Sequence, residues 1–244
     1  MLKKIFLCFL LLILMRPAGA EGPEKLHVGI LDLPPLYEVG PDGKPGGILM
    51  EFLTSILDHA GYTYDMVVYP PRRLYWNIAQ GRCHVFLGVK NVPELEGRVL
   101  YSKKNITNID MSVYAFGEKK LPAKKEDLYG NRVIVIRGYS YGGLINELKD
   151  PDNGVELMEA SDHIHAFRQL AAGRGDYLLN YRRAAEHAMR VMSIEEEVRS
   201  SSLELIGVFL KVSKQVKDAE ILMQKLEEAW NFLESEKVIP DFIH

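Results

Sequence analysis

Basic side chains follow the segments that the sequence predicts as strands in the first half of the chain. Arg73 comes shortly after the second predicted strand, Lys90 directly follows the third, and Arg98 lies in the loop beyond it. An arginine holds a carboxylate with two parallel hydrogen bonds, and a lysine attracts it as a point charge. These residues therefore suit the binding of an anionic group, although each type also occurs in solvent-exposed salt bridges.

Aromatic and polar side chains occupy the same kind of position in both halves of the chain. Tyrosine rings close over small ligands, and they also pack at the interface of two lobes. Ser140 precedes a predicted helix, where free backbone N–H groups and the helix dipole favour an anion, and where serine is also a common N-cap. The candidate ligand-binding residues are Asp32, Tyr37, Arg73, Lys90, Arg98, Tyr139, Ser140, Tyr141, Asn180 and Tyr181.

One segment, residues 69–89 with the sequence YPPRRLYWNIAQGRCHVFLGV, positions the first of these basic residues. Pro71 suits a first helical turn, and Gly81 suits the left-handed residue that ends a helix. The apolar run that follows is too short for a helix and is typical of a strand buried on both faces. Residues 170–179 (LAAGRGDYLL) repeat the pattern of residues 78–87 (IAQGRCHVFL). This repeat in each half indicates two lobes of similar build with a ligand cleft between them.

The first lobe is predicted to contain parallel strands that alternate with helices. A strand at residues 26–31 is followed by a loop rich in proline and glycine, by a helix that begins at Gly47, and by a strand at residues 64–69. Apolar residues at helical spacing mark the core-facing side of that helix. Together with residues 69–89, this order predicts an α/β lobe whose ligands bind beyond the carboxyl ends of the strands.

The second lobe is predicted as an insertion into the first. Residues 110–116 form a strand that leaves the first lobe and residues 203–211 form one that returns, so that crossings near residues 113 and 204 permit a hinge. Ser213 is expected to cap a long last helix. The elements expected within the insertion are a strand at 132–136, a helix capped by Ser140, a strand at 155–158, a helix from Ser161 or Asp162 to Gly173, a strand at 176–180 and a helix at 181–192.

Residues 1–20 have the composition of a secretory signal peptide. Lysines precede an apolar run that is too short to span a bilayer comfortably, and small residues follow at the cleavage position; a retained membrane anchor is the alternative. The rest is expected to form lobe 1 from residues 25–113 and 204–244 and lobe 2 from residues 114–203. We therefore expect a soluble, monomeric protein in the periplasm.

Charge and cysteine content argue against several functions. Residues 1–20 carry three of the 30 basic side chains and none of the 33 acidic ones, so the remainder has a formal net charge of −6. This balance disfavours nucleic acid as a partner, because phosphate binding needs a basic surface. Cys83 is the one cysteine after residue 20, so no internal disulfide forms there. His163 and His165 lie on different faces of a predicted helix, and we predict neither a metal site nor a cofactor.

The order and spacing of several motifs resemble those of the extracellular solute-binding proteins of family 3, which have the type II periplasmic-binding-protein fold. The motifs are GGILMEFLTSILDHAGY, IAQGRCHVFLGV, Tyr101-Ser102, DLYGNRVIVIRGYSYG, LAAGRGDYLLNY and the final strand with its helix. They cover nearly the whole chain after residue 20. The resemblance implies two lobes that close on a small ligand without catalysis, as in the binding proteins that deliver polar amino acids to an ABC permease.

The binding positions of that family match this chain only in part. The family arginine that pairs with the ligand carboxylate falls at Glu96, and Arg98 lies two residues later. The family acid that binds the ligand ammonium falls at Tyr181, and the acid of the first lobe falls at His84. These departures indicate an anionic or zwitterionic ligand other than a standard α-amino acid.

Two other positions match the family better. The Gly-Thr-Thr at a helix start of the second lobe corresponds to Gly138-Tyr139-Ser140. A related subgroup carries Pro-x-x-Arg at the place where Pro70 and Arg73 stand, so the resemblance assigns Arg73 to the mouth of the cleft.

The resemblance leaves more than one use for such a binding event. The same lobe closure serves an importer or the input domain of a membrane signalling protein. A few proteins of this fold are dehydratases, for which Asp32, Glu51 and His84 would be the candidate acids and bases by position. No phosphate-binding loop occurs in the sequence, and we predict that the protein is not an enzyme.

Overall fold

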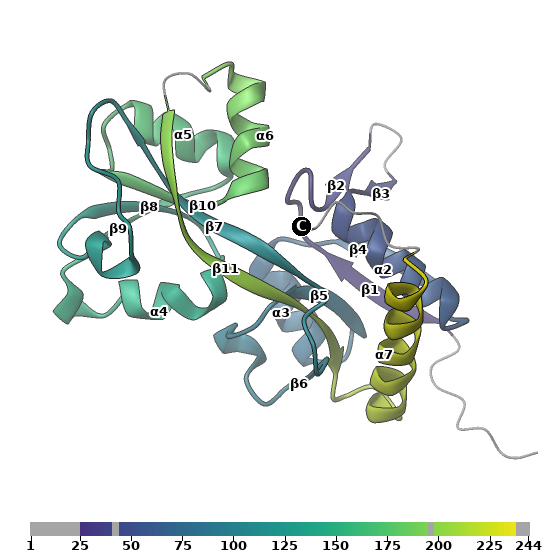
Figure 1. Cartoon of the computed structure of the whole chain (residues 1–244). Coiled ribbons are helices and arrows are strands. Elements are labelled where there is room, and N and C mark those ends of the chain that lie inside the picture. The colour runs from purple at the N-terminus through teal and green to yellow at the C-terminus, as the bar shows by residue number, and fades with distance from the viewer. Residues whose placement is uncertain (1–24, 41–43, 195–197, 238–244) are drawn as a thin grey trace, which may run out of the picture.

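The computed structural model describes residues 25–40, 44–194 and 198–237. It confirms the predicted α/β architecture: helices group at the two ends of one long sheet, and two strands run between the groups (Figure 1). Within the described residues, no helix is long and apolar enough to cross a membrane. The predicted signal peptide at residues 1–20 lies outside the described residues.

The first half of the sheet contains parallel strands, as the sequence predicts. They are β1 (Leu26–Ile30), β4 (Tyr64–Val68) and β5 (Val85–Val89), with β1 between the other two. Helices α2 (Ile48–His59) and α7 (Ala219–Ser235) pack together, with the rings of Phe52 and Trp230 6.0 Å apart. The remaining elements of this half are the hairpin β2 (Glu38–Val39) and β3 (Pro45–Gly46), helix α3 (Pro71–Ala79), the 3-10 turn η1 (Pro93–Leu95) and strand β6 (Val99–Tyr101).

Two long antiparallel strands join the halves. β7 (Thr107–Phe116) and β11 (Val198–Ser213) pair along most of their length, with a register shift between Ser202 and Glu204. β11 also pairs with β5 and β6, so it belongs to the first half and to the connection. The predicted crossings near residues 113 and 204 fall within these strands. The exact lobe boundaries stay a prediction.

The second half repeats the build of the first. Its parallel strands are β8 (Arg132–Ile136), β9 (Glu156–Ala160) and β10 (Tyr177–Tyr181), and β10 pairs with β7. Its helical elements are η2 (Lys125–Leu128), η3 (Tyr141–Gly143), α4 (Leu144–Leu148), η4 (Pro151–Asn153), α5 (His163–Ala171) and α6 (Arg182–Met192). The full strand order is β4-β1-β5-β11-β7-β10-β8-β9, with β6 beside β11.

The repeated helix–glycine–strand unit is confirmed. Helix α3 leads into β5 through Gly81, and α5 leads into β10 through Gly173. Both glycines have a left-handed φ, 72° and 66° respectively, which a residue without Cβ adopts at low cost. The carboxyl ends of the two strands, Val89 of β5 and Tyr181 of β10, both lie at the space between the halves.

Two predicted helix caps are wrong. Ser213 is the last residue of β11, because the strand continues there to pair with Val99 of β6, and α7 begins after Asp218 instead. Ser140 precedes η3, but its hydroxyl makes no capping hydrogen bond. Tyr141 has a φ of 50°, so the chain does not start a regular helical turn there. The N–H groups of such a turn would donate hydrogen bonds to the hydroxyl of Ser140.

Candidate functional site

A narrow cavity, which we call the tyrosine cavity, lies between the two halves and has a volume of ≈ 30 Å³. Ligand pockets usually measure about 300–1,000 Å³, whereas one liquid water takes about 30 Å³. The tyrosine cavity is therefore much smaller than a usual ligand pocket. The lining residues are Leu31, Leu33, Tyr37, Leu49, Tyr75, Phe86, Leu87, Gly88, Val89 and Val92 of the first half, Ile109 of β7, and Tyr139, Ser140 and Tyr181 of the second half.

Two buried tyrosines, Tyr139 and Tyr181, form most of the wall that the second half contributes, and a third, Tyr141, packs behind them. Tyr139 and Tyr181 stack with ring centroids 5.7 Å apart and an interplanar angle of 22°. Tyr141 lies 5.9 Å from Tyr139 and 5.5 Å from Tyr181. Its hydroxyl accepts a hydrogen bond of 2.7 Å from the N–H of Ile136, which helps to hold its left-handed backbone in place. Such strain costs about 1–3 kcal/mol and occurs most often at functional sites.

A buried histidine orients this wall. The hydroxyl of Tyr139 lies 3.3 Å from Nε2 of His163, and Nδ1 of His163 lies 3.0 Å from Oδ1 of Asn180. Oδ1 of Asn180 also accepts the N–H of Tyr181, so it is an acceptor, and Nδ1 of His163 must be the donor. The tyrosine hydroxyl then donates to Nε2. Burial lowers the pKa of His163 to about 4, so the ring is neutral near pH 7.

We expect the protein to lose stability between about pH 6.5 and pH 4 because of His163. The pKa of this histidine is about 4 in the folded state and near 6.5 in the unfolded chain, so only the unfolded chain binds the proton in this window. The free energy of unfolding therefore falls as the pH is lowered, by about 3 kcal/mol in total for a shift of this size. Urea unfolding near pH 7 and near pH 4.5 measures the difference.

A His163→Gln variant is expected to lose most of this pH dependence, whereas the exposed His165→Gln is expected to keep it. His84 contributes in the same direction, because burial lowers its pKa too. Equal pH slopes in the wild type and in the His163 variant would contradict the assignment.

Two polar groups of the second half, at or near the tyrosine cavity, are buried without a partner among the described residues. They are the hydroxyl of Ser140 and Nδ2 of Asn180. Buried polar groups are nearly always hydrogen-bonded, and an unpaired one raises the free energy of the folded state. The hydroxyl of Ser140 is thus available to a ligand at the cavity wall.

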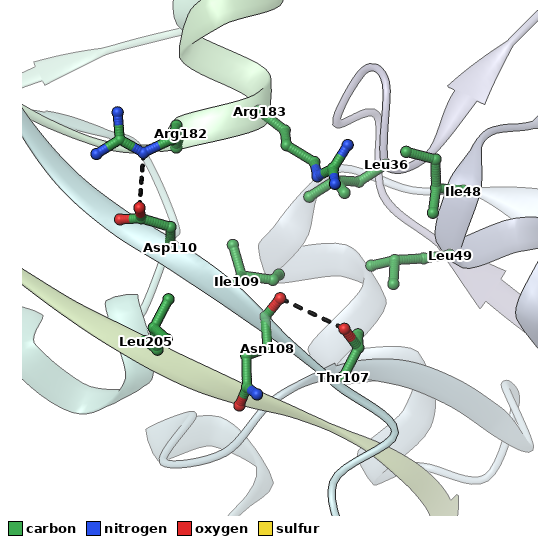
Figure 2. Close-up of a pocket in the computed structure, with 10 residues that line it drawn as sticks. All are labelled: Leu36, Ile48, Leu49, Thr107, Asn108, Ile109, Asp110, Arg182, Arg183 and Leu205. Atoms are coloured by element: carbon green, nitrogen blue, oxygen red, sulfur yellow. Dashed lines mark hydrogen bonds and ion pairs between the residues drawn. The ribbon is translucent and has the colours of Figure 1, made fainter. Parts of the chain in front are cut away.

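A larger pocket of ≈ 420 Å³, which we call the arginine pocket, adjoins the tyrosine cavity (Figure 2). Leu49 and Ile109 line both, so a ligand in one borders the other. The volume falls in the range of small-molecule sites. The lining residues are Leu36, Ile48 and Leu49 of the first half, Thr107, Asn108, Ile109, Asp110 and Leu205 of the joining strands, and Arg182 and Arg183 of α6.

The arginines are the first two residues of α6, where the helix dipole favours anions. Figure 2 shows Arg182 turned toward Asp110 and Arg183 directed toward Leu36 on the opposite side of the pocket. Nε of Arg182 lies 2.6 Å from Oδ2 of Asp110. Burial alone would raise the pKa of Asp110, but hydrogen bonds from Arg182, Ser112 and Ser202 outweigh it and hold that pKa below its usual range. This ion pair fixes the start of α6 on β7.

The structure brings together some of the sequence-predicted residues. Tyr37, Tyr139, Ser140 and Tyr181 line the tyrosine cavity, where the hydroxyl of Tyr37 donates to the carbonyl of Leu87 at 2.7 Å. Tyr141 and Asn180 stand one layer behind, in contact with Tyr181 or His163.

The other predicted residues lie apart from both cavities. Asp32, Arg73 and Arg98 are exposed and line neither the tyrosine cavity nor the arginine pocket. Lys90 places its Nζ 3.7 Å from the ring centroid of Phe209, outside both. Their role in ligand binding stays a prediction.

Several residues at the site are not among the candidates predicted from the sequence. Tyr75 and Phe86 of the first half line the tyrosine cavity, and their rings are 6.4 Å apart. Arg182 and Arg183 follow Tyr181 directly, and a pair of arginines at the start of a helix after a strand was the available signal. A second signal in the sequence was Lys211, a charged residue inside the apolar run LIGVFLKVS.

Comparison with known proteins identifies the fold. No family model matches the chain, and no curated protein matches it. Among solved structures, the chain is similar to a histidine kinase sensor domain with similarity to periplasmic binding proteins, with a TM-score of 0.75, 19% identity, and 89% of this chain and 93% of that chain covered. The chain therefore has the two-lobe periplasmic-binding-protein fold.

Two further neighbours have the same fold. An ancestral arginine-binding protein bound to arginine matches with a TM-score of 0.72 and 17% identity, over 89% of this chain and 95% of that chain. The substrate-binding protein of an amino acid ABC transporter matches with a TM-score of 0.69 and 16% identity, over 87% of this chain and 94% of that one. These neighbours are binding proteins.

Proposed function

We propose that the chain is a non-catalytic receptor that captures a small organic anion or zwitterion between its two halves. The observation that carries this proposal is the convergence of both halves on one cavity that adjoins a pocket with two arginines. The fold supports it, since compared proteins of this fold bind amino acids or serve as sensor domains.

The ligand is expected to have an apolar body and an acidic group. The walls of the tyrosine cavity are aromatic and aliphatic, and aromatic rings favour flat apolar groups. Arg183 at the arginine pocket, together with the start of α6, attracts anions toward the opening. A charge-assisted hydrogen bond contributes about 1.5–3 kcal/mol, and micromolar affinity needs about 8 kcal/mol in total. Burial of the apolar body must therefore supply much of the affinity.

Entry of a ligand into the tyrosine cavity requires the two halves to move. The tyrosine cavity of ≈ 30 Å³ holds no metabolite, so the halves must separate or the tyrosines must turn before a ligand enters. β7 and β11 are the connections along which such a hinge would bend. A ligand that contacts both halves then shifts the population toward the closed form.

The membrane protein that recognises the closed form depends on the compartment in which the protein acts. We propose a periplasmic protein, with lobe 1 formed by residues 25–113 and 204–244, that delivers its ligand to an ABC permease. One neighbour belongs to an amino acid ABC transporter, which favours this use. The input domain of a membrane signalling protein is the second candidate, because another neighbour is a histidine kinase sensor domain.

Thermal unfolding in the presence of a panel of organic acids, amino acids and peptides tests the proposal. At least one solute is expected to raise the melting temperature, and Ser140→Ala is expected to weaken its binding about fivefold, the equivalent of one lost hydrogen bond of about 1 kcal/mol. Ser55→Ala, on the exposed side of α2, is the matched control and should not change affinity. A panel in which no solute shifts the melting temperature would contradict the proposal.

A further inference from the structure

A lysine in the first half is fully buried, and its amine has no hydrogen-bond partner among the described residues. This residue is Lys211 of β11, and it is 0% exposed. Aromatic rings surround the amine: Nζ lies 4.4 Å from the ring centroid of Phe86 and 5.9 Å from that of Tyr101. Lysine is almost never fully buried without a paired group, so this position requires an explanation.

The side chain of Lys211 extends toward the tyrosine cavity. Lys211 stands opposite Phe86 in the register of β11 and β5, yet its Nζ lies 3.1 Å from the point that a Cβ on Gly88 would occupy. The side chain therefore runs along β5 toward its carboxyl end. Phe86 and Gly88 both line the tyrosine cavity, so the amine lies directly behind the cavity wall. The missing side chain at Gly88 leaves room for it.

No acidic group balances the amine among the contacts of the described residues. The titratable side chains nearest the amine are Tyr101 of β6, Lys90, whose Nζ is 5.5 Å from the Tyr101 ring, and Tyr75 of α3, whose ring is 6.4 Å from that of Phe86. Glu94 of η1 acts electrostatically on Tyr75, and no contribution from it to the pKa of Lys211 is seen. Burial lowers the pKa of Lys211 well below its usual range, which favours the neutral form of the amine.

We propose that Lys211 receives the acidic group of the ligand and that ligand binding adds a proton to its amine. This inference rests on the proposed function and specifies its ligand as a carboxylic acid rather than an uncharged analogue. The proton comes from solvent, the neutral amine becomes an ammonium, and no covalent bond forms or breaks. A carboxylate that enters beside Gly88 supplies the opposite charge that the site lacks, which favours the charged form of the lysine.

Calorimetric titration with phenylacetate and its uncharged isostere phenylacetamide tests the inference. The wild-type protein is expected to bind the acid at least about tenfold more tightly than the amide. The heat of binding should differ between phosphate and Tris buffers, as expected when about one proton is taken up per bound acid. Lys211→Met should lose most of the preference for the acid, keep only the contribution of Arg183 and the start of α6, and show no buffer dependence. Lys214→Met, an exposed lysine three residues later in the chain, should behave as the wild type.

A measurement without ligand completes the test. The Nζ signal of Lys211 in a protein labelled with nitrogen-15 lysine, assigned with Lys211→Met, should be that of a neutral amine near pH 7. An ammonium signal there overturns the inference. So does an acid preference of undiminished size or a proton uptake that persists in Lys211→Met, or the failure of phenylacetate to bind. Equal binding of acid and amide also overturns it, but leaves the proposed receptor function standing, because a ligand is still captured.

Discussion

The Lys211→Met variant is expected to be more stable than the wild-type protein near pH 7, by about 1–3 kcal/mol. Lys211 is fully buried and its amine is unpartnered among the described residues, so folding removes a polar group from water without compensation. Methionine has nearly the same length and lacks the amine, so it fills the space beside Phe86 and Tyr101. Urea unfolding of both proteins measures the gain.

The pH dependence of this gain identifies its cause. Because burial lowers the folded-state pKa of Lys211 below that of the unfolded chain, the unfolded chain binds more protons at every pH between the two values. Wild-type stability should therefore rise through this window toward about pH 10.4, the pKa of an unperturbed lysine. The advantage of the methionine variant should shrink over the same range. A variant less stable than the wild type at every pH would show that the amine makes favourable contacts with the rings.

The fold could be predicted from the sequence because each element carries its own local signal. Pro71, the apolar stripe of α3, Gly81 and the apolar run of β5 all agree, and the unit recurs from α5 to β10. Local propensity, hydrophobic period and turn chemistry point to one structure there. The caps failed where long-range pairing decided the backbone, as with Ser213, which β6 draws into the sheet.

The candidate site was harder to predict because it depends on which way side chains point. Arg73 follows a strand, as the general rule for α/β sheets requires, but its position on α3 exposes it to solvent. Arg182 and Arg183 reach the pocket because α6 starts at the joining strands. The residues on either side of Lys211 in the sequence are apolar. The sequence alone does not show that its amine extends toward a cavity that distant segments form.

Truncation of Tyr139 is expected to have a large cost in stability. Tyr139 is 6% exposed, it stacks on Tyr181, and it lines the tyrosine cavity together with residues of the first half. Replacement of a buried aromatic ring by alanine usually costs about 3–5 kcal/mol, because the lost contacts leave a cavity. We expect Tyr139→Ala to lose about 3 kcal/mol of unfolding free energy in urea titrations.

The conservative variant Tyr139→Phe separates the ring from its hydroxyl. Phenylalanine keeps the stack on Tyr181 but leaves Nε2 of His163 without its donor, so we expect a cost of about 1 kcal/mol. The alanine variant also widens the space between the halves, and it should therefore bind bulkier aromatic acids than the wild type does. If both variants lost the same stability, the hydroxyl contact to His163 rather than ring packing would hold this wall, and widening of the cavity would no longer be expected.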